Sequence, residues 1–269
     1  MRTAFYNGVS GLVAYQNQMD LLSNNIANVN SYGFKGSRAA FSDLLYTEMY
    51  VNTDERARDG QTAEAAGENP ATIDSDGIHL VGHGIKMFDS DLVMRQGSPL
   101  PTQNPLDFAL VGEGFFAVQR PDGSIQYTRD GTFDIGLQGR NGYLVASSDG
   151  SFILDGKGKQ IKLKRDPETK LFDLTQLKDT IGVYTFSNPY GLEPAGGTRF
   201  RQTDKSGEAQ SANNAKEHPY TLIQHSVEQS SVDLAEEMTN VIIAQKAFQF
   251  SAKMVQTADQ VEEIINNLR

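Results

Sequence analysis

Cysteine is absent from this chain of 269 residues. Its absence excludes disulfides, thiol catalysis and cysteine-ligated zinc, and it is compatible with a cytoplasmic protein or with one that leaves the cytoplasm. Long apolar runs are absent too: no stretch of eighteen apolar residues occurs, so we expect no transmembrane helix. The N-terminus shows neither the apolar region nor the cleavage site of a secretory signal peptide. We expect this amphipathic segment to stay part of the folded protein.

Positive charge is scarce relative to negative charge. The chain has 24 lysine and arginine residues against 34 aspartate and glutamate residues, which gives a net charge of −10. Because binding to phosphates requires a basic surface, we expect no nucleic acid partner. At 269 residues the chain is long enough for one or two domains with a sizeable core.

The motifs of cofactor and metal sites are incomplete. Gly112-Glu113-Gly114 lacks the third glycine and the following helix of a dinucleotide-binding loop, so we interpret it as a tight turn. His79 and His83 have the spacing of helical metal ligands, but the segment is strand-like and no third ligand lies near them in the sequence. We therefore expect neither a metal ion nor a cofactor.

Catalytic residues are equally hard to find. Asp130, Asp134 and Asp149 are candidates for a carboxylate pair, but they occur at turns, where aspartate hydrogen-bonds its own backbone. No Gly-x-Ser-x-Gly or other nucleophile motif is present. We predict that the chain is not an enzyme and has no small-molecule substrate. The rival hypotheses are a β-rich hydrolase that uses Asp130 or Asp134, and a secreted binding module with a coiled-coil stalk.

Apolar or small residues recur at helical spacing at both ends of the chain. In the first thirty residues they are Phe5, Val9, Leu12, Met19, Leu22, Ile26 and Val29. Near the C-terminus they are Val227, Ser231, Leu234, Met238, Val241, Phe248, Ala252, Val255, Ala258, Val261, Ile265 and Leu268. Steps of three and four are typical of a coiled-coil seam. The pattern predicts that the two ends pair and that other molecules pack against them.

Between the ends, the sequence predicts strands. Asp-Gly and Asn-Gly turns recur at short intervals from residue 78 to 224, as in an all-β domain. Residues 41–50 suit either a helical turn or an extended arm, and 52–77 read as a loop or linker. We expect helices over 3–29 and from Ser230 to the end, with Ser230 or Ser231 as the N-cap.

The predicted fold class is α+β, with long N- and C-terminal helices paired as a coiled coil around an inserted all-β central domain. The predicted division of the chain is a helical domain of 1–46 plus 226–269, an extended linker of 47–77, and a β-rich domain of 78–225.

Asparagine clusters where the first helix should end. Asn24, Asn25, Asn28 and Asn30 fall within seven residues, although asparagine is a mediocre helix former. One interpretation is a fraying helix end. The other is that Asn24 and Asn25 hydrogen-bond between packed helices and fix their register.

Short motifs occur at both ends and in the middle of the chain. The N-terminal motif is Leu22-Ser23-Asn24-Asn25-Ile26-Ala27-Asn28-Val29-Asn30 followed by Gly33-Phe34-Lys35. The C-terminal motif includes Val227-Glu228 and Gln245-Lys246-Ala247-Phe248. The middle contains Tyr127-Thr128-Arg129-Asp130-Gly131 and Phe186-Ser187-Asn188-Pro189. Together these motifs resemble the bacterial flagellar rod and hook family of axial proteins, and the likeness spans nearly the whole chain.

This resemblance implies a structural subunit that polymerises into a helical tube and transmits motor torque to the hook. Length and the Phe186-Ser187-Asn188-Pro189 segment are most similar to a distal-rod member, with a proximal-rod or hook subunit as the alternative. The implied location is the flagellar basal body, reached through the flagellar type III export apparatus. The implied partners are further copies, neighbouring rod and hook proteins, and surrounding ring proteins. The implied role of residues 47–77 is contact with adjacent subunits.

The resemblance also implies which residues pack in the assembly. Terminal helices of this family would line the tube, with asparagines holding register between subunits. The candidate subunit-packing residues are Leu12, Met19, Leu22, Asn24, Asn25, Ile26, Asn28, Phe34, Leu234, Met238, Val241, Phe248, Val255 and Ile265.

Overall fold

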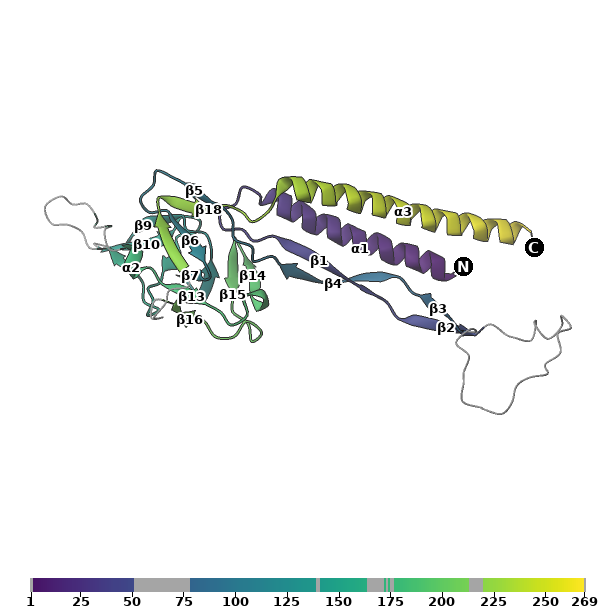
Figure 1. The fold of residues 1–269 in the computed structure, drawn as a ribbon, viewed down its shortest axis with the longest axis horizontal. Helices are drawn as coiled ribbons and strands as arrows, with labels where there is room; N and C mark the ends of the chain where they lie inside the picture. The colour runs from purple at the N-terminus through teal and green to yellow at the C-terminus, as the bar shows by residue number, and fades with distance from the viewer. Residues whose placement is uncertain are drawn as a thin grey trace, which may run out of the picture. The chain divides into compact units, whose positions relative to one another are not determined.

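The computed structural model describes residues 2–50, 78–138, 141–163, 172, 174, 177–212 and 220–268. It contains a long helix near each end of the chain and a central β region, so the predicted α+β class is confirmed (Figure 1). The chain forms two compact units, which we describe separately. The first unit comprises Met1–Asp20, Ala39–Asp89 and Ile242–Arg269, and the second comprises Leu21–Arg38 and Ser90–Val241.

The first half of the chain begins with a helix and continues as strands. Its elements are α1 (Arg2–Ala27), β1 (Ser37–Asp43), β2 (Tyr46–Tyr50), β3 (Ile78–Gly82), β4 (Ile85–Leu92), β5 (Pro99–Pro101), β6 (Phe108–Gly112), β7 (Phe115–Gln119), β8 (Ile125–Thr128) and β9 (Phe133–Gln138).

The second half continues the β region and closes with the long helix. Its elements are β10 (Asn141–Ala146), β11 (Phe152–Ile153), β12 (Lys162–Leu163), α2 (Leu177–Thr180), β13 (Val183–Thr185), η3 (Pro189–Gly191), β14 (Glu193–Gly196), β15 (Arg199–Arg201), β16 (Gln210–Ser211), β17 (Tyr220–Gln224), β18 (Ser226–Glu228) and α3 (Leu234–Asn267).

The helix α3 begins later than the sequence suggested. The N-cap is Asp233, whose Oδ1 accepts hydrogen bonds from the backbone N–H groups of Ala235 at 2.9 Å and Glu236 at 3.4 Å. The prediction of Ser230 or Ser231 as the cap was wrong, because both residues belong to the segment that joins β18 to the helix. Glu236 and Glu237 stand in the first turn, where the helix dipole favours acidic groups.

In the first unit, α1 packs on the strands that follow it. Segment 41–50 is extended, which agrees with the interpretation as an extended arm rather than a helical turn. Strand β2 pairs antiparallel with β3. Asn7 Nδ2 donates a hydrogen bond to the carbonyl oxygen of Gly82 at 3.0 Å, and Ser10 Oγ accepts one from the N–H of Ile85 at 3.4 Å. The ring of Tyr15 lies 6.0 Å from that of Phe41 on β1. These contacts place one side of α1 against strands β1, β3 and β4.

The second unit is built around a sheet of ten strands among the described residues. Strand β7 lies inside it, paired with β8, β11 and β13. Alternate side chains of a strand point to opposite faces, so Phe116 and Val118 enter one apolar cluster with Phe133, and Phe115 enters the other with Phe200. Both faces of β7 are therefore buried, which explains its continuous apolar sequence.

The β7–β8 hairpin forms where the sequence predicted it. Phe116 stands opposite Thr128 and Val118 opposite Gln126, and Asp122-Gly123 forms the turn between the strands. Asp122 Oδ1 accepts a hydrogen bond from the N–H of Ser124 at 2.8 Å, the local bonding that makes aspartate a frequent turn residue.

Candidate assembly surface and buried polar junction

The two long helices approach each other closely within the first unit. A Cβ atom placed on Gly8 would lie 2.7 Å from Val255 Cγ2, and one placed on Gly11 would lie 2.9 Å from Ser251 Oγ. The contact moves backwards along α3 as it moves forwards along α1, so the helices run antiparallel. Small residues create this close approach, because a side chain on either glycine would occupy space that α3 fills.

Large apolar side chains of α3 face away from this contact. Ala244 is fully buried, whereas Phe250 is 64% exposed. The other exposed large apolar residues of α3 are Leu234, Met238, Ile242, Ile243, Met254, Ile264 and Ile265, and Leu268 just after the helix is exposed as well. On α1 the exposed ones are Phe5, Tyr6 and Val13. The helices therefore carry more apolar surface than their mutual packing covers.

The predicted subunit-packing residues fall into three groups by exposure. Leu22 and Asn25 are buried. The partly buried residues are Leu12, Met19, Ile26, Asn28, Phe34, Val241, Phe248 and Val255. The exposed residues are Asn24, Leu234, Met238 and Ile265. Each stays a candidate for packing in an assembly.

The asparagines of the cluster make different kinds of hydrogen bond. Asn25 is 1% exposed, and its Nδ2 donates hydrogen bonds to the carbonyl oxygen of Ser37 at 2.8 Å and to Glu237 Oε1 on α3 at 3.1 Å. Burial raises the pKa of Glu237, and the bond from Asn25 partly offsets that increase. Asn28 instead donates to the carbonyl oxygen of Asn24 at 2.9 Å and caps the last turn of α1. Asn25 thus joins two helices, while Asn28 bonds locally.

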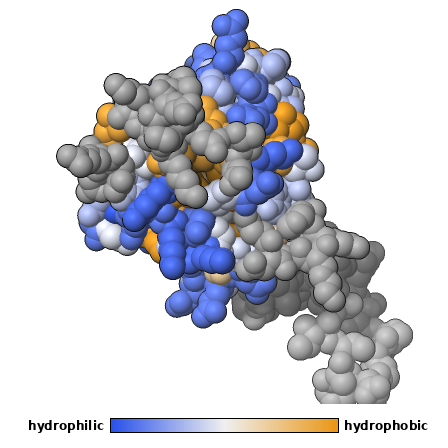
Figure 2. All heavy atoms as spheres, turned by 90° about the vertical axis from the view of Figure 1, so that its left-hand side faces the viewer, coloured by the Kyte–Doolittle hydropathy of each residue, from blue (hydrophilic) through white to orange (hydrophobic). Residues whose placement is uncertain are grey.

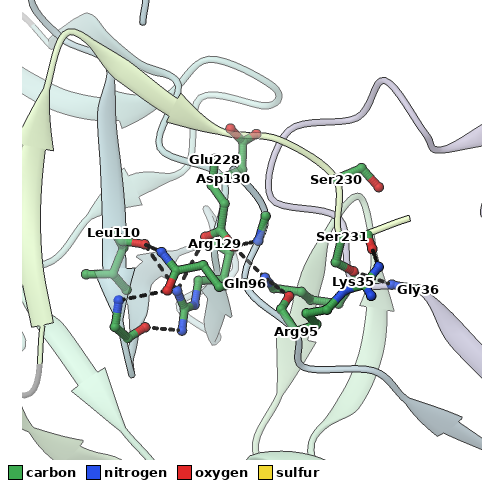
Figure 3. Close-up of polar contacts among 12 residues, drawn as sticks. Lys35, Gly36, Arg95, Gln96, Leu110, Arg129, Asp130, Glu228, Ser230 and Ser231 are labelled. Carbon is green, nitrogen blue, oxygen red and sulfur yellow. Dashed lines mark hydrogen bonds and ion pairs between the residues drawn. The ribbon is translucent and has the colours of Figure 1, made fainter. Parts of the chain in front are cut away.

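A buried ion triad lies in the second unit, where the segments next to α1 and α3 meet the β strands (Figure 3). Glu228, at the end of β18, is 1% exposed. Its Oε1 accepts hydrogen bonds from Lys35 Nζ at 2.5 Å and from the N–H of Gly97 at 2.9 Å. Its Oε2 lies 3.3 Å from Arg129 Nη1. We call Lys35, Arg129 and Glu228 the junction triad.

Neutral groups complete the environment of the two cations. Arg129 donates from Nη2 to the carbonyl oxygen of Gly112 at 2.8 Å and from Nη1 to that of Leu110 at 3.3 Å. Its guanidinium carbon lies 5.2 Å from the ring centre of Phe115, within range of a cation–π interaction. Burial lowers the pKa of Lys35, and the carboxylate of Glu228 partly offsets the decrease.

Backbone hydrogen bonds tie the same two terminal segments together. The N–H of Gly33 donates to the carbonyl oxygen of Glu228 at 2.8 Å, and the N–H of Ser231 donates to that of Phe34 at 3.1 Å. The N–H of Gly36 donates to Ser231 Oγ at 3.2 Å. Gly33 has φ of +66°, and a Cβ there would lie 2.4 Å from the backbone nitrogen of Asp130. Only glycine fits this position, because both its backbone angle and its surroundings exclude a side chain.

All three triad residues lie within the motifs that carry the family resemblance, but the sequence alone predicted no role for them. One signal was available: Lys35 and Glu228 each have uncharged residues on both sides, whereas Arg129 is followed directly by Asp130. That signal does not say which charges meet, because the three positions are far apart in the chain and only the fold unites them.

Of the carboxylates considered as catalytic candidates, Asp130 and Asp149 lie in connections between strands, whereas Asp134 lies in β9 opposite Val145, so its expected place at a turn was wrong. Asp130 Oδ1 accepts hydrogen bonds from the N–H and hydroxyl of Thr132, and Asp134 Oδ1 accepts one from the N–H of Ile135. Among the residues that the structure describes, no group of three or more histidine, aspartate or glutamate side chains is placed to hold a metal ion. None of the helices in the described ranges combines the length and apolarity needed to cross a membrane.

Three family models match the beginning, the middle and the end of the chain. Residues 5–35 match the flagella basal body rod protein model, 109–177 the flagellar hook protein FlgE/F/G D1 domain, and 223–268 the flagellar basal body rod FlgEFG protein C-terminal model. The chain is 34% identical to the flagellar basal-body rod protein FlgG of Caulobacter vibrioides, with 99% of both chains covered. It is 30% identical to that of Bacillus subtilis, with 100% of both covered. The chain belongs to the flagellar basal-body rod family.

Membership of this family defines the role of the chain at a coarse level. It is a structural subunit of the flagellar rod, in the basal body of the flagellum. The matched ends contain most of α1 and all of α3, and two of the three triad residues, Lys35 and Glu228, fall in these matched ends. The helical surface and the junction are therefore both parts of a structural protein.

Proposed function

We propose that α1 and α3 together form the surface through which copies of this chain polymerise into a helical tube. The single observation that carries this proposal is the distribution of side chains on α3. Ser251 and Val255 pack against Gly8 and Gly11 of α1, whereas large apolar residues such as Phe250 and Met238 are exposed. Fully burying one such side chain contributes about 1.5–3 kcal/mol, so a row of them supports a stable subunit contact.

The second unit offers a different kind of surface. On its face turned toward the viewer in Figure 2, hydrophilic residues predominate and hydrophobic ones are scattered. Scattered apolar residues are normal on protein surfaces and need no partner. The candidate packing residues, among them Leu12, Met19 and Ile265, lie on or beside the helices. We therefore place the subunit contacts on the helices.

Within the rod, the proposed position is the distal rod. The support is the length of the chain, the Phe186-Ser187-Asn188-Pro189 segment, and the coverage of whole basal-body rod proteins in the comparisons. A proximal-rod or hook position is the alternative. Electron microscopy of basal bodies from a strain lacking this chain tests the assignment: a distal-rod subunit predicts a short proximal rod, and arrest at any other point would contradict it.

The proposed partners are further copies of the chain, neighbouring rod and hook proteins, surrounding ring proteins and the flagellar type III export apparatus. The proposed division into 1–46 plus 226–269, 47–77 and 78–225 stays a prediction, as does the absence of an enzymatic function. Residues 51–77, which were assigned to subunit contacts, lie outside the described residues.

Phe250→Asp tests the polymerisation surface. Because Phe250 is 64% exposed, the change should leave the folded monomer intact while placing a charge in the subunit contact. We expect loss of polymerisation in vitro and loss of swimming when the variant replaces the native chain. Gln249→Asp, at the neighbouring exposed position, is the matched control and should retain both. Normal swimming with Phe250→Asp would refute the proposal.

A further inference from the structure

The junction triad joins three separate parts of the second unit. Lys35 belongs to the segment that follows α1, Glu228 to the strand that precedes α3, and Arg129 to the turn between β8 and β9. Glu228 is bonded to both cations, so its carboxylate connects the two terminal segments to the β strands. The backbone bonds of Gly33 and Ser231 connect the terminal segments directly to each other.

Stability alone is a weak reason for such a triad. Well-packed apolar residues often replace a buried ion pair without loss of stability, whereas removing one partner is strongly destabilising because the other charge stays buried and unpaired. Buried charges are best attested as devices that select one arrangement over others. The triad holds two cations and one anion, so the arrangement depends on Glu228 in particular.

The two cations differ in how they are held without Glu228. Arg129 keeps the carbonyl oxygens of Leu110 and Gly112 and the ring of Phe115. Lys35 keeps a single further acceptor, the carbonyl oxygen of Arg95 at 2.9 Å. Loss of the carboxylate would leave two like charges in one buried site, and Lys35 is the one that would leave.

We propose that Glu228 is a positioning residue for rod assembly. Glu228 binds Lys35 and Arg129 at the same time. The segment after α1 and the segment before α3 therefore pack against the β strands only together, because each depends on the other. This holds the last turn of α1 beside the first turn of α3, where Asn25 bonds to Glu237. The inference rests on the proposed function, because ordered helix ends matter for assembly only if the helices carry the polymerisation surface.

The first test is hydrogen exchange of the full-length monomer carrying Glu228→Gln, which keeps the shape and removes the charge. We expect protection of residues 31–37 and 229–237 to fall by at least about tenfold, while the amides of β7 and β10 change little. Unchanged protection at 31–37 would refute the positioning role. This measurement uses the monomer, so it does not depend on whether the helices form the assembly surface.

A second variant separates electrostatic coupling from general damage. Adding Lys35→Met to Glu228→Gln removes one of the two cations that lost their partner and leaves Arg129 bonded to its carbonyl acceptors, so protection of 31–37 should recover by about tenfold relative to Glu228→Gln alone. Lys35→Met by itself leaves the Arg129–Glu228 pair neutral and should have the mildest effect. If the losses in the double variant are the sum of those in the two single variants, the residues are not coupled and the proposal is wrong.

The control is another ion pair of the second unit, between buried Arg199 and Asp149, whose side chain is 35% exposed. Asp149→Asn breaks the contact between Asp149 and Arg199, which joins the turn after β10 to β15 and contacts neither terminal segment. We expect lower stability of the β region but normal protection of 31–37 and normal polymerisation. If Asp149→Asn impairs polymerisation as much as Glu228→Gln at equal loss of stability, the positioning role is refuted. If Phe250→Asp assembles normally, the proposed function fails instead.

Discussion

Replacing Gly8 by alanine should destabilise the α1–α3 contact, although alanine is the better helix former. In the interior of a helix, alanine is favoured over glycine by about 1 kcal/mol. The new Cβ, however, would lie 2.7 Å from Val255 Cγ2 and 3.4 Å from the carbonyl oxygen of Ser251. Valine in a helix is nearly confined to one χ1 rotamer, so Val255 has little freedom to yield.

Two free-energy terms determine whether Gly8→Ala stabilises or destabilises the protein. Inserting a methyl group into a tight contact costs about 1–3 kcal/mol, which exceeds the gain in helix propensity and leaves a net loss of about 1 kcal/mol. In a Val255→Ala background the obstructing methyl group is gone. There, Gly8→Ala should stabilise the protein by about 0.5–1 kcal/mol, so the sign reverses and the coupling energy is about 2 kcal/mol.

Urea unfolding followed by circular dichroism at 222 nm measures all four proteins of this double-mutant cycle. Gly11→Ala is an informative comparison, because its nearest obstruction is Ser251 Oγ at 2.9 Å, a hydroxyl group that rotates away at little cost. Gly11→Ala should therefore keep most of the gain in helix propensity and stabilise the protein by about 0.5–1 kcal/mol. If Gly8→Ala stabilises the native background as much as the Val255→Ala background, the close helix contact does not exist.

Three further predictions concern the second unit. Burial by itself would raise the pKa of Asp149, but hydrogen bonds from Arg199 and Ser151 outweigh it and lower the pKa to about 2. Because the folded pKa lies below the unfolded value, ionised Asp149 stabilises the folded state by about 1–2 kcal/mol above pH 4, after discounting for solvent screening. This stabilisation is lost as the pH falls toward 2. Acid unfolding of Asp149→Asn should lack this pH-dependent loss of stability. Asp233→Ala removes the N-cap of α3 and should cost about 1 kcal/mol in urea unfolding, with Asp233→Asn close to neutral. Gly33→Ala should cost more than about 2 kcal/mol, because the position combines positive φ with backbone contact, and equal midpoints for mutant and native protein would contradict this.

Local signals explain why much of the architecture was predictable. The three–four spacing of apolar residues indicated α1 and most of α3, and Asp122-Gly123 indicated the β7–β8 hairpin. Both patterns depend on neighbours within a few residues, which is the range over which helix and turn geometry operate. The start of α3 was misplaced because Ser230, Ser231 and Asp233 are all good N-caps, and local sequence does not rank them.

The candidate site was less accessible, because it depends on residues that are distant in sequence. Apolar spacing suggested that the ends pair, but the antiparallel contact through Gly8 and Gly11 is made by small residues, which a search for large apolar positions passes over. The sequence also did not decide which asparagine bonds to another helix. Asn25 and Asn28 belong to one cluster, yet only the fold brings Glu237 to Asn25.

The sequence by itself determined that this chain has helical ends, a β-rich middle and the motifs of an axial flagellar protein. Those properties follow from periodicity, turn residues and short motifs, each of which is a local pattern. The tertiary structure alone decided that Lys35, Arg129 and Glu228 share one buried site. The physical reason is that a charge can be buried only where partners from other segments neutralise it, and the spacing of residues along a chain does not specify which segments meet.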